Sequence, residues 1–265
     1  MSASPYIFDG PDADVVLRAP LQPGSQEFKD FHVHKLILSI ASTVFQDILS
    51  IPQPPRDTSE GTATDIVQVT ESAEVLEAFL QLIYPVDPPV IKDLRLVEDL
   101  LEAADKYMAK GVSTKLKKRL VSLLRDDPIG VFAIACRNNL DEEARLALSH
   151  TFSFDIINQI SETHLQIMTA GAYHRLLTEH IRRGKQLVDA VSGARCSCRC
   201  GQTVKKEIQL RMSGRLCLDR AVVGACLPPL GSRGTGCSPH MPCISQTPEL
   251  RSAFLSDVMS RIQAT

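Results

Sequence analysis

The stretch from Phe31 to Phe45, FHVHKLILSIASTVF, most constrains what this chain can fold into. Its first residues alternate as in a strand and end at His34-Lys35, and apolar residues at helical spacing follow. Ser42 is a typical helix N-cap, so a second helix is predicted to begin directly after it. A strand that runs straight into two short helices predicts sheet and helices in one small domain.

Two further segments complete the predicted sheet. Residues 14–19 alternate as a first strand, and Pro23-Gly24 marks the turn into the second strand at 27–33. A third strand is predicted at 65–70. Before it, residues 52–64 contain three prolines and no large apolar residue, which predicts a flexible surface loop.

Helical periodicity dominates the rest of the first half. Ser72 is predicted to cap a helix that ends at Tyr84-Pro85, because the residue before proline avoids helical geometry. Amphipathic helices are predicted at 93–109 and 113–125, and Gly111 is predicted to separate them. Met108 is predicted to lie on the buried side of the first of these helices. The fold class is α+β, a small sheet flanked by about five helices.

An all-helical extension is predicted at 127–192. Asp127-Pro128 begins a short helix with Pro at the first helical position. Helices at 141–152 and 161–191 follow, and the last is predicted to be two helices that meet near Gly184. Residues 193–265 form a Cys-rich basic tail, which closes with an amphipathic helix that opens at Thr247-Pro248-Glu249.

The order strand, hairpin, His-Lys, helix pair and third strand resembles the BTB/POZ domain over residues 8–125. The layout is closest to stand-alone fungal BTB-domain-containing proteins. This resemblance implies a protein–protein interaction module, scaffold or adaptor without catalysis of its own. It also implies a substrate adaptor of a cullin-type ubiquitin ligase as one specific role, with the third strand, the following helix and the helical extension as the cullin-binding surface.

The resemblance also marks candidate interaction residues. Asp14 and Lys35 correspond to a charged pocket at the dimer seam, or alternatively form a plain ion pair. Leu36, Ile37 and Ile40 correspond to the dimer-forming face of the first helix, or alternatively are core. The thirteen residues before Asp14 are too short and broken to form the swapped N-terminal helix of many dimeric members, which leaves homodimerisation open.

The tail cysteines suggest a different chemistry. Seven of the eight cysteines follow residue 190, and three of these alternate in the segment CSCRC. Zinc takes four thiolate or imidazole ligands, but the chain has no CxxC knuckle, so free thiols and disulfides remain alternatives. The candidate ligands are Cys196, Cys198, Cys200, Cys217, Cys226, Cys237, His240 and Cys243. A zinc-binding transcriptional or nucleic-acid-associated regulator is therefore the alternative function.

Composition and charge exclude several further classes of function. The net charge is −2, and the basic run from Arg182 to Arg220 contains no aromatic residue for base stacking, so nucleic acid is not the expected partner. The N-terminus lacks the basic and apolar regions of a secretory signal, which predicts an intracellular protein of cytoplasm or nucleus. No nucleophile–base pair or phosphate loop suggests an enzyme, and no cofactor is expected besides zinc.

Overall fold

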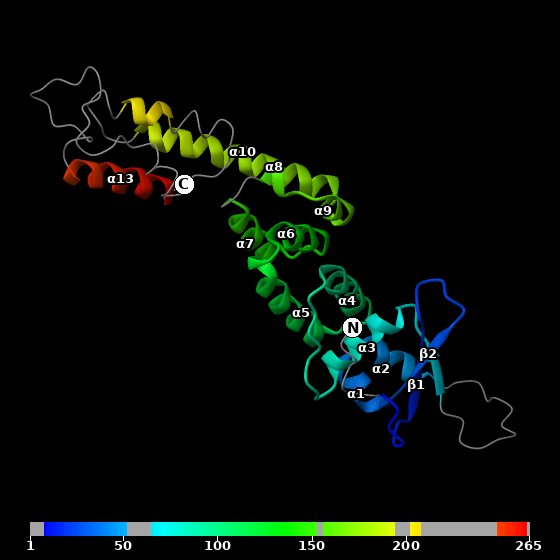
Figure 1. Cartoon of the computed structure of the whole chain (residues 1–265). Helices are drawn as coiled ribbons and strands as arrows, with labels where there is room; N and C mark the ends of the chain where they lie inside the picture. The colour runs from blue at the N-terminus through cyan, green and yellow to red at the C-terminus, as the bar shows by residue number, and fades with distance from the viewer. Residues whose placement is uncertain (1–7, 52–64, 153–155, 194–201, 208–247, 264–265) are drawn as a thin grey trace, which may run out of the picture. The chain divides into compact units, whose positions relative to one another are not determined.

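The computed structural model describes residues 8–51, 65–152, 156–193, 202–207 and 248–263. Its contacts divide the chain into two units. The first comprises residues 1–127 with 138–143, and the second comprises residues 128–137 with 144–265. Figure 1 shows the sheet and its helices at the N-terminal end of the chain and helices alone after them. The predicted loop at 52–64 lies outside the described residues.

The sheet of the first unit has three strands in the order β2-β1-β3. β1 (Val15–Pro20) pairs antiparallel with β2 (Phe28–Val33) and parallel with β3 (Asp65–Gln68). The left-handed Gly24, at φ 78°, supplies the turn between β1 and β2. The predicted three-strand sheet of an α+β domain is confirmed, and each strand boundary lies within two residues of its prediction.

The free side of β2 is partly covered. The backbone N–H of His32 donates to the Phe8 carbonyl at 2.8 Å, and Asp9 forms a parallel bridge with His32. On the other side of the sheet, β3 has no further strand among the described residues. The two edges of the sheet therefore differ in how much of their backbone is paired.

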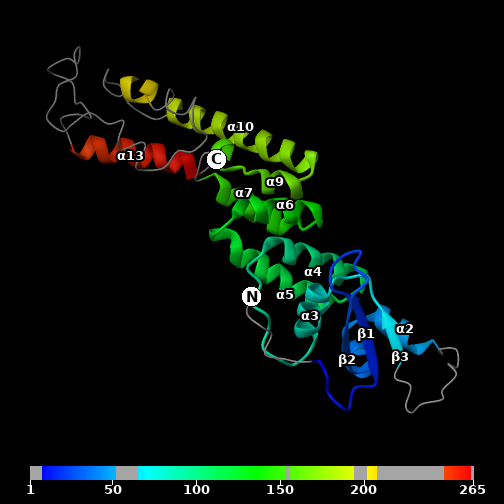
Figure 2. The same cartoon turned by 45° about the vertical axis from the view of Figure 1, so that its right-hand side comes forward.

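Five helices accompany the sheet: α1 (Lys35–Ala41), α2 (Thr43–Ser50), α3 (Ala73–Ile83), α4 (Leu94–Lys106) and α5 (Lys110–Ser122). A short 3-10 turn, η1 (Leu123–Arg125), follows α5. Ser42, Ser72 and Asp93 cap α2, α3 and α4, since each side chain accepts a hydrogen bond from the first turn. Figure 2 shows α3 between the sheet and the α4–α5 pair. The predicted caps at Ser42 and Ser72 are thus confirmed.

The break between α4 and α5 corrects the prediction. Gly111 lies inside α5, and the chain instead turns at Met108, whose φ is 50°. The turn buries Tyr107 on one side and exposes Met108 on the other, so the prediction that Met108 faces inward is wrong. Packing of Tyr107 fixes the turn, and the permissive backbone of Gly111 is not needed for it.

The core of the first unit contains an aromatic cluster between helices. Phe45 is fully buried and stacks on Tyr107, with ring centroids 4.4 Å apart and planes at 14°. Phe79 contacts the same tyrosine ring at 5.5 Å. The buried Ser42 hydroxyl donates to the Tyr107 carbonyl at 2.5 Å and accepts from the Phe45 N–H at 3.0 Å. The start of α2 is therefore fixed to the end of α4.

The helices that follow are α6 (Pro128–Arg137), α7 (Asp141–Thr151), α8 (Ile156–Gln159), α9 (Glu162–Ile167), α10 (Ala170–Gly193) and α13 (Pro248–Gln263). The predicted helices that begin at Pro128, Asp141 and Pro248 are confirmed. Gly184 lies within α10, so the predicted break there is wrong. The helical run is instead interrupted at Met168, whose backbone is extended. The Thr169 side chain then caps α10 by accepting a hydrogen bond from the Ala172 N–H at 3.1 Å.

The second unit buries a polar pair between α7 and α10. Thr151 and His180 are both fully buried, and Thr151 Oγ1 lies 2.8 Å from His180 Nε2. The threonine hydroxyl donates to the Leu148 carbonyl at 2.6 Å, so the imidazole Nε2–H is the donor of the shared bond. The Phe152 ring packs on the His180 ring at 4.9 Å. This bonded pair fixes the contact between the two helices.

Candidate protein-interaction surface

The first helix is held at its N-terminus by the carboxylate of Asp14. The Lys35 backbone N–H donates to Asp14 Oδ1 at 2.7 Å, while the N-cap residue His34 makes no side-chain cap bond. A carboxylate at this position satisfies an otherwise unpaired N–H and interacts favourably with the helix dipole. Since Asp14 directly precedes β1, the orientation of α1 is tied to the central strand.

The side chain of Lys35 reaches a different acid. Its Nζ lies 2.6 Å from Asp65 Oδ2, at the start of β3. Asp65 is opposite Val15 in the parallel ladder, so Asp14 and Asp65 come from adjacent strand ends. The structure therefore brings the predicted residues Asp14 and Lys35 together through the backbone, and the ammonium of Lys35 pairs with an acid that sequence reasoning missed.

His34 has a positioning role at this junction. Its backbone N–H donates to the Tyr84 hydroxyl at 2.8 Å, and its Nδ1 lies 3.1 Å from the same oxygen. On the other side of the ring, His34 Nε2 lies 3.3 Å from Asp12 Oδ2. A backbone hydrogen bond and the contact with His34 lower the pKa of Asp12. The imidazole thus links the helix start to a buried tyrosine.

The outer face of α1 is apolar. Leu36 and Ile40 lie one turn apart and are 70% and 79% exposed, whereas Ile37 is half-buried. Leu38 is the residue of this helix that enters the core. In a single copy of the chain, Leu36 and Ile40 are therefore not core residues, and that alternative is wrong. Adjacent exposed apolar side chains of this size are typical of a contact surface.

The predicted zinc ligands cannot be placed. Cys196, Cys198, Cys200, Cys217, Cys226, Cys237, His240 and Cys243 all lie outside the described residues. Within the described ranges, no three His, Cys, Asp or Glu side chains gather in a way that could hold a metal ion. Cys136 is half-buried. The zinc hypothesis therefore stays a prediction.

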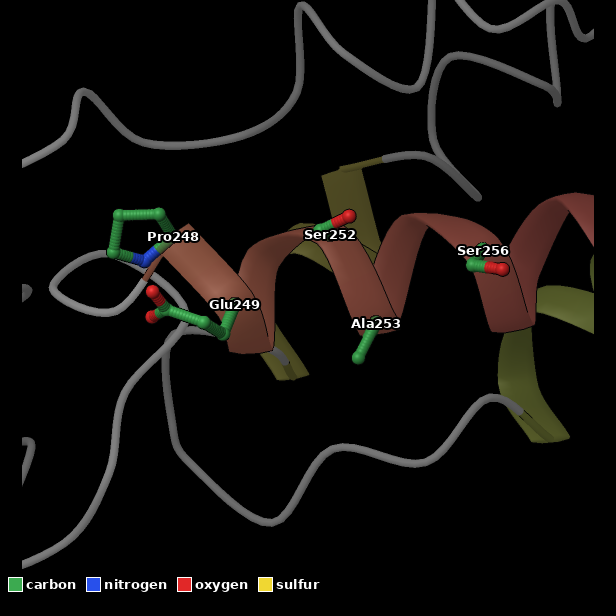
Figure 3. A pocket seen from close by; sticks show the side chains of 5 residues that line it. All are labelled: Pro248, Glu249, Ser252, Ala253 and Ser256. Atoms are coloured by element: carbon green, nitrogen blue, oxygen red, sulfur yellow. The ribbon is translucent and has the colours of Figure 1, made fainter.

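A shallow hollow lies on one side of α13. Its lining residues all come from that helix: Pro248, Glu249, Ser252, Ala253 and Ser256. Figure 3 shows their short side chains spread along the helix, with Glu249 as the single charged group among those labelled. The arrangement offers no acid–base pair and no nucleophile beside a base. It does not have the features of a catalytic cleft.

Three further observations concern the described helices and the similarity of the chain to known proteins. Among the helices that the structure describes, none combines the length and apolar character needed to cross a membrane. Residues 14–124 match the family model of the BTB/POZ domain. No curated protein matches the chain significantly. The match begins at Asp14 and ends within η1, so it contains the sheet and helices α1 to α5.

Proposed function

Residues 14–124 are a BTB/POZ domain, a protein–protein interaction module, and from this premise we propose that the chain is an adaptor that pairs with a second copy through α1. The observation that supports the pairing is the exposed apolar face made by Leu36 and Ile40. Burying two such side chains from each copy removes apolar surface from water, which favours association. The charged residues Asp14, Lys35 and Asp65 surround the start of the same helix and give the contact a polar rim.

The pairing is tested by placing a charge on the apolar face. Leu36→Asp combined with Ile40→Asp is expected to weaken dimerisation of the full chain at least about a hundredfold, because a carboxylate would be buried without a partner. Sedimentation equilibrium measures the dissociation constant. Val90→Asp is the matched control, since Val90 is 80% exposed and lies outside α1. An unchanged dimer in the double variant, or an equal effect of Val90→Asp, would contradict the proposal.

The finer role that we propose is that of a substrate adaptor for a cullin-type ubiquitin ligase. The run of helices that follows the domain supports this role, because the family resemblance implies that such an extension, together with the third strand and the helix after it, binds the cullin. Gln68 and Glu74 are exposed on these two elements. Gln68→Arg with Glu74→Arg is expected to reduce binding of a purified cullin N-terminal region at least about tenfold, because two bulky cations would replace smaller groups at the contact.

Calorimetric titration of the full chain with that cullin region measures this effect, and Val90→Asp again serves as the control. Thermal melting of the double variant should stay within a few degrees of the unmodified chain, since both residues are exposed. Absence of binding by the unmodified chain would refute the cullin role while leaving the pairing through α1 intact.

A further inference from the structure

The cations of the first unit are partnered unequally. Four of them, on the sheet, α1 and α4, have acidic partners: Arg18 with Asp30, Lys29 with Glu77, Lys35 with Asp65 and Lys106 with Glu71. On α5 and η1, by contrast, the side chains of four cations form no ion pair with any residue in the described part of the chain: Lys110, Lys117, Lys118 and Arg125. The helix α5 itself contains no acidic residue.

These unpaired cations share one side of the helix. Lys110, Lys117 and Lys118 stand at i, i+7 and i+8, which places them within about a quarter of the helical circumference. Lys110 and Lys118 are exposed, Lys117 is half-buried, and Val121 lies between them at 37% exposure. Arg125 continues the row on η1. We call Lys110, Lys117, Lys118 and Arg125 the basic face.

The other two cations of α5, Lys115 and Arg119, have a structural role within the domain. The Lys115 ammonium donates to the Leu82 carbonyl in the last turn of α3, at 2.6 Å. Arg119 Nε donates to the Ile91 carbonyl at 2.6 Å. These two side chains satisfy backbone acceptors of the domain and fix α5 in place. The basic face is not needed for that task.

An acidic face lies on the neighbouring helix. Asp99 and Glu102 are exposed on α4, Asp93 caps the same helix, and Glu74 is exposed on α3. Partial desolvation, together with the charges of Glu102, Asp93 and Glu74, raises the pKa of Asp99 despite the opposing charge of Arg95. None of the charges that act on Asp99 comes from α5. Glu102, Asp93 and Glu74 therefore lie close enough to Asp99 to repel its charge.

We propose that a second copy of this chain docks the acidic face of its α4 and α3 on the basic face of α5. The occupant follows from charge complementarity, because the domain itself carries both signs on separate faces. The two faces differ, so the contact is heterologous and each copy uses one face toward each neighbour. Exposed ion pairs are individually weak, so the association is expected at high protein concentration and low salt. It is independent of α1.

The test uses the full chain carrying Leu36→Asp and Ile40→Asp, which removes any dimerisation through α1. Sedimentation velocity at about 0.1 mM protein is expected to show reversible association in about 20 mM salt that weakens at least about tenfold in about 300 mM salt, where screening shortens the range of the charges. A chain that is monomeric at low salt would overturn the proposal.

Charge reversal on each face then identifies the contact. Lys117→Glu with Lys118→Glu, and separately Asp99→Lys with Glu102→Lys, should each abolish the association. An equimolar mixture of the two variants should restore it, because each retains one native face that complements the other. Lys185→Glu with Lys206→Glu is the matched control, since both lysines are exposed and lie in the second unit. Association that survives either reversal, or a mixture that stays monomeric, would overturn the proposal.

Discussion

Replacing Phe45 with alanine is expected to lower the free energy of unfolding of the BTB/POZ domain by roughly 3–5 kcal/mol. The ring is fully buried and stacked on Tyr107, so its loss removes both transfer free energy and the stacking contact, and leaves a cavity. Urea denaturation monitored by circular dichroism measures the change. The tyrosine ring and Phe79 are held from other helices and cannot simply collapse into the space.

Phe28→Ala is the matched control for this variant. Phe28 is the same residue type and is the first residue of β2, but it is exposed, so its removal should cost less than about 1 kcal/mol. A similarly small loss for Phe45→Ala would show that the aromatic cluster does not carry the stability of the domain, and that α2 is held by other contacts.

Glu71→Ala is expected to destabilise the domain by roughly 1–3 kcal/mol, because it leaves a buried phenol without its acceptor. Glu71 Oε2 accepts from the Tyr107 hydroxyl at 2.5 Å, and Oε1 lies 2.6 Å from the Lys106 ammonium. Burial alone would raise the pKa of Glu71, but the hydrogen bonds from Lys106 and Tyr107 outweigh it and hold the pKa below its usual value. Burial and the bond to Glu71 raise the pKa of Tyr107, so the phenol remains a donor at neutral pH.

The lowered pKa of Glu71 gives a defined pH dependence. A carboxyl with a depressed folded-state pKa stabilises the fold fully above its unfolded pKa, near 4.5 for glutamate, and this stabilisation is lost as the pH falls through the folded value. Stability of the unmodified chain should therefore fall more steeply below about pH 4.5 than that of Glu71→Gln. Glu27→Gln, at an exposed position, should leave the slope unchanged. Parallel slopes for all three proteins would exclude this role of Glu71.

Local signals were sufficient to predict most of the fold. The serines before α2 and α3 are caps whose effect acts within one turn, so Ser42 and Ser72 could be identified from the sequence. The family resemblance, stated on the strand–His-Lys–helix order, was confirmed by the match over residues 14–124. The extent of the helical extension and of the tail as separate domains stays a prediction.

The errors arose where tertiary contacts outweigh a local preference. Gly111 and Gly184 have low helix propensity, but each lies within a helix. The true break at Met108 adopts a left-handed conformation that follows from burying Tyr107. A propensity argument cannot anticipate a turn that depends on a stacking partner as far along the chain as Phe45.

The candidate site was predicted only in part for a similar reason. Asp14 and Lys35 were identified through the resemblance, but the ion pair of Lys35 with Asp65 depends on the parallel register of β1 and β3. The hydrogen bonds of His34 to Tyr84 likewise depend on where α3 ends. The signal that could have found Asp65 is its position at the very start of the third predicted strand.

The unequal edges of the sheet determine how it could be extended. Phe8 and Asp9 occupy part of the hydrogen-bonding row of β2, as an edge strand requires if it is not to pair with foreign chains. Any strand contributed by another molecule would therefore add more readily beside β3, where Asp65 holds Lys35. Such an added strand would begin next to the first turn of α1. A strand bound beside β3 and a second copy bound to α1 would then occupy adjacent surface, so that binding of one would exclude the other.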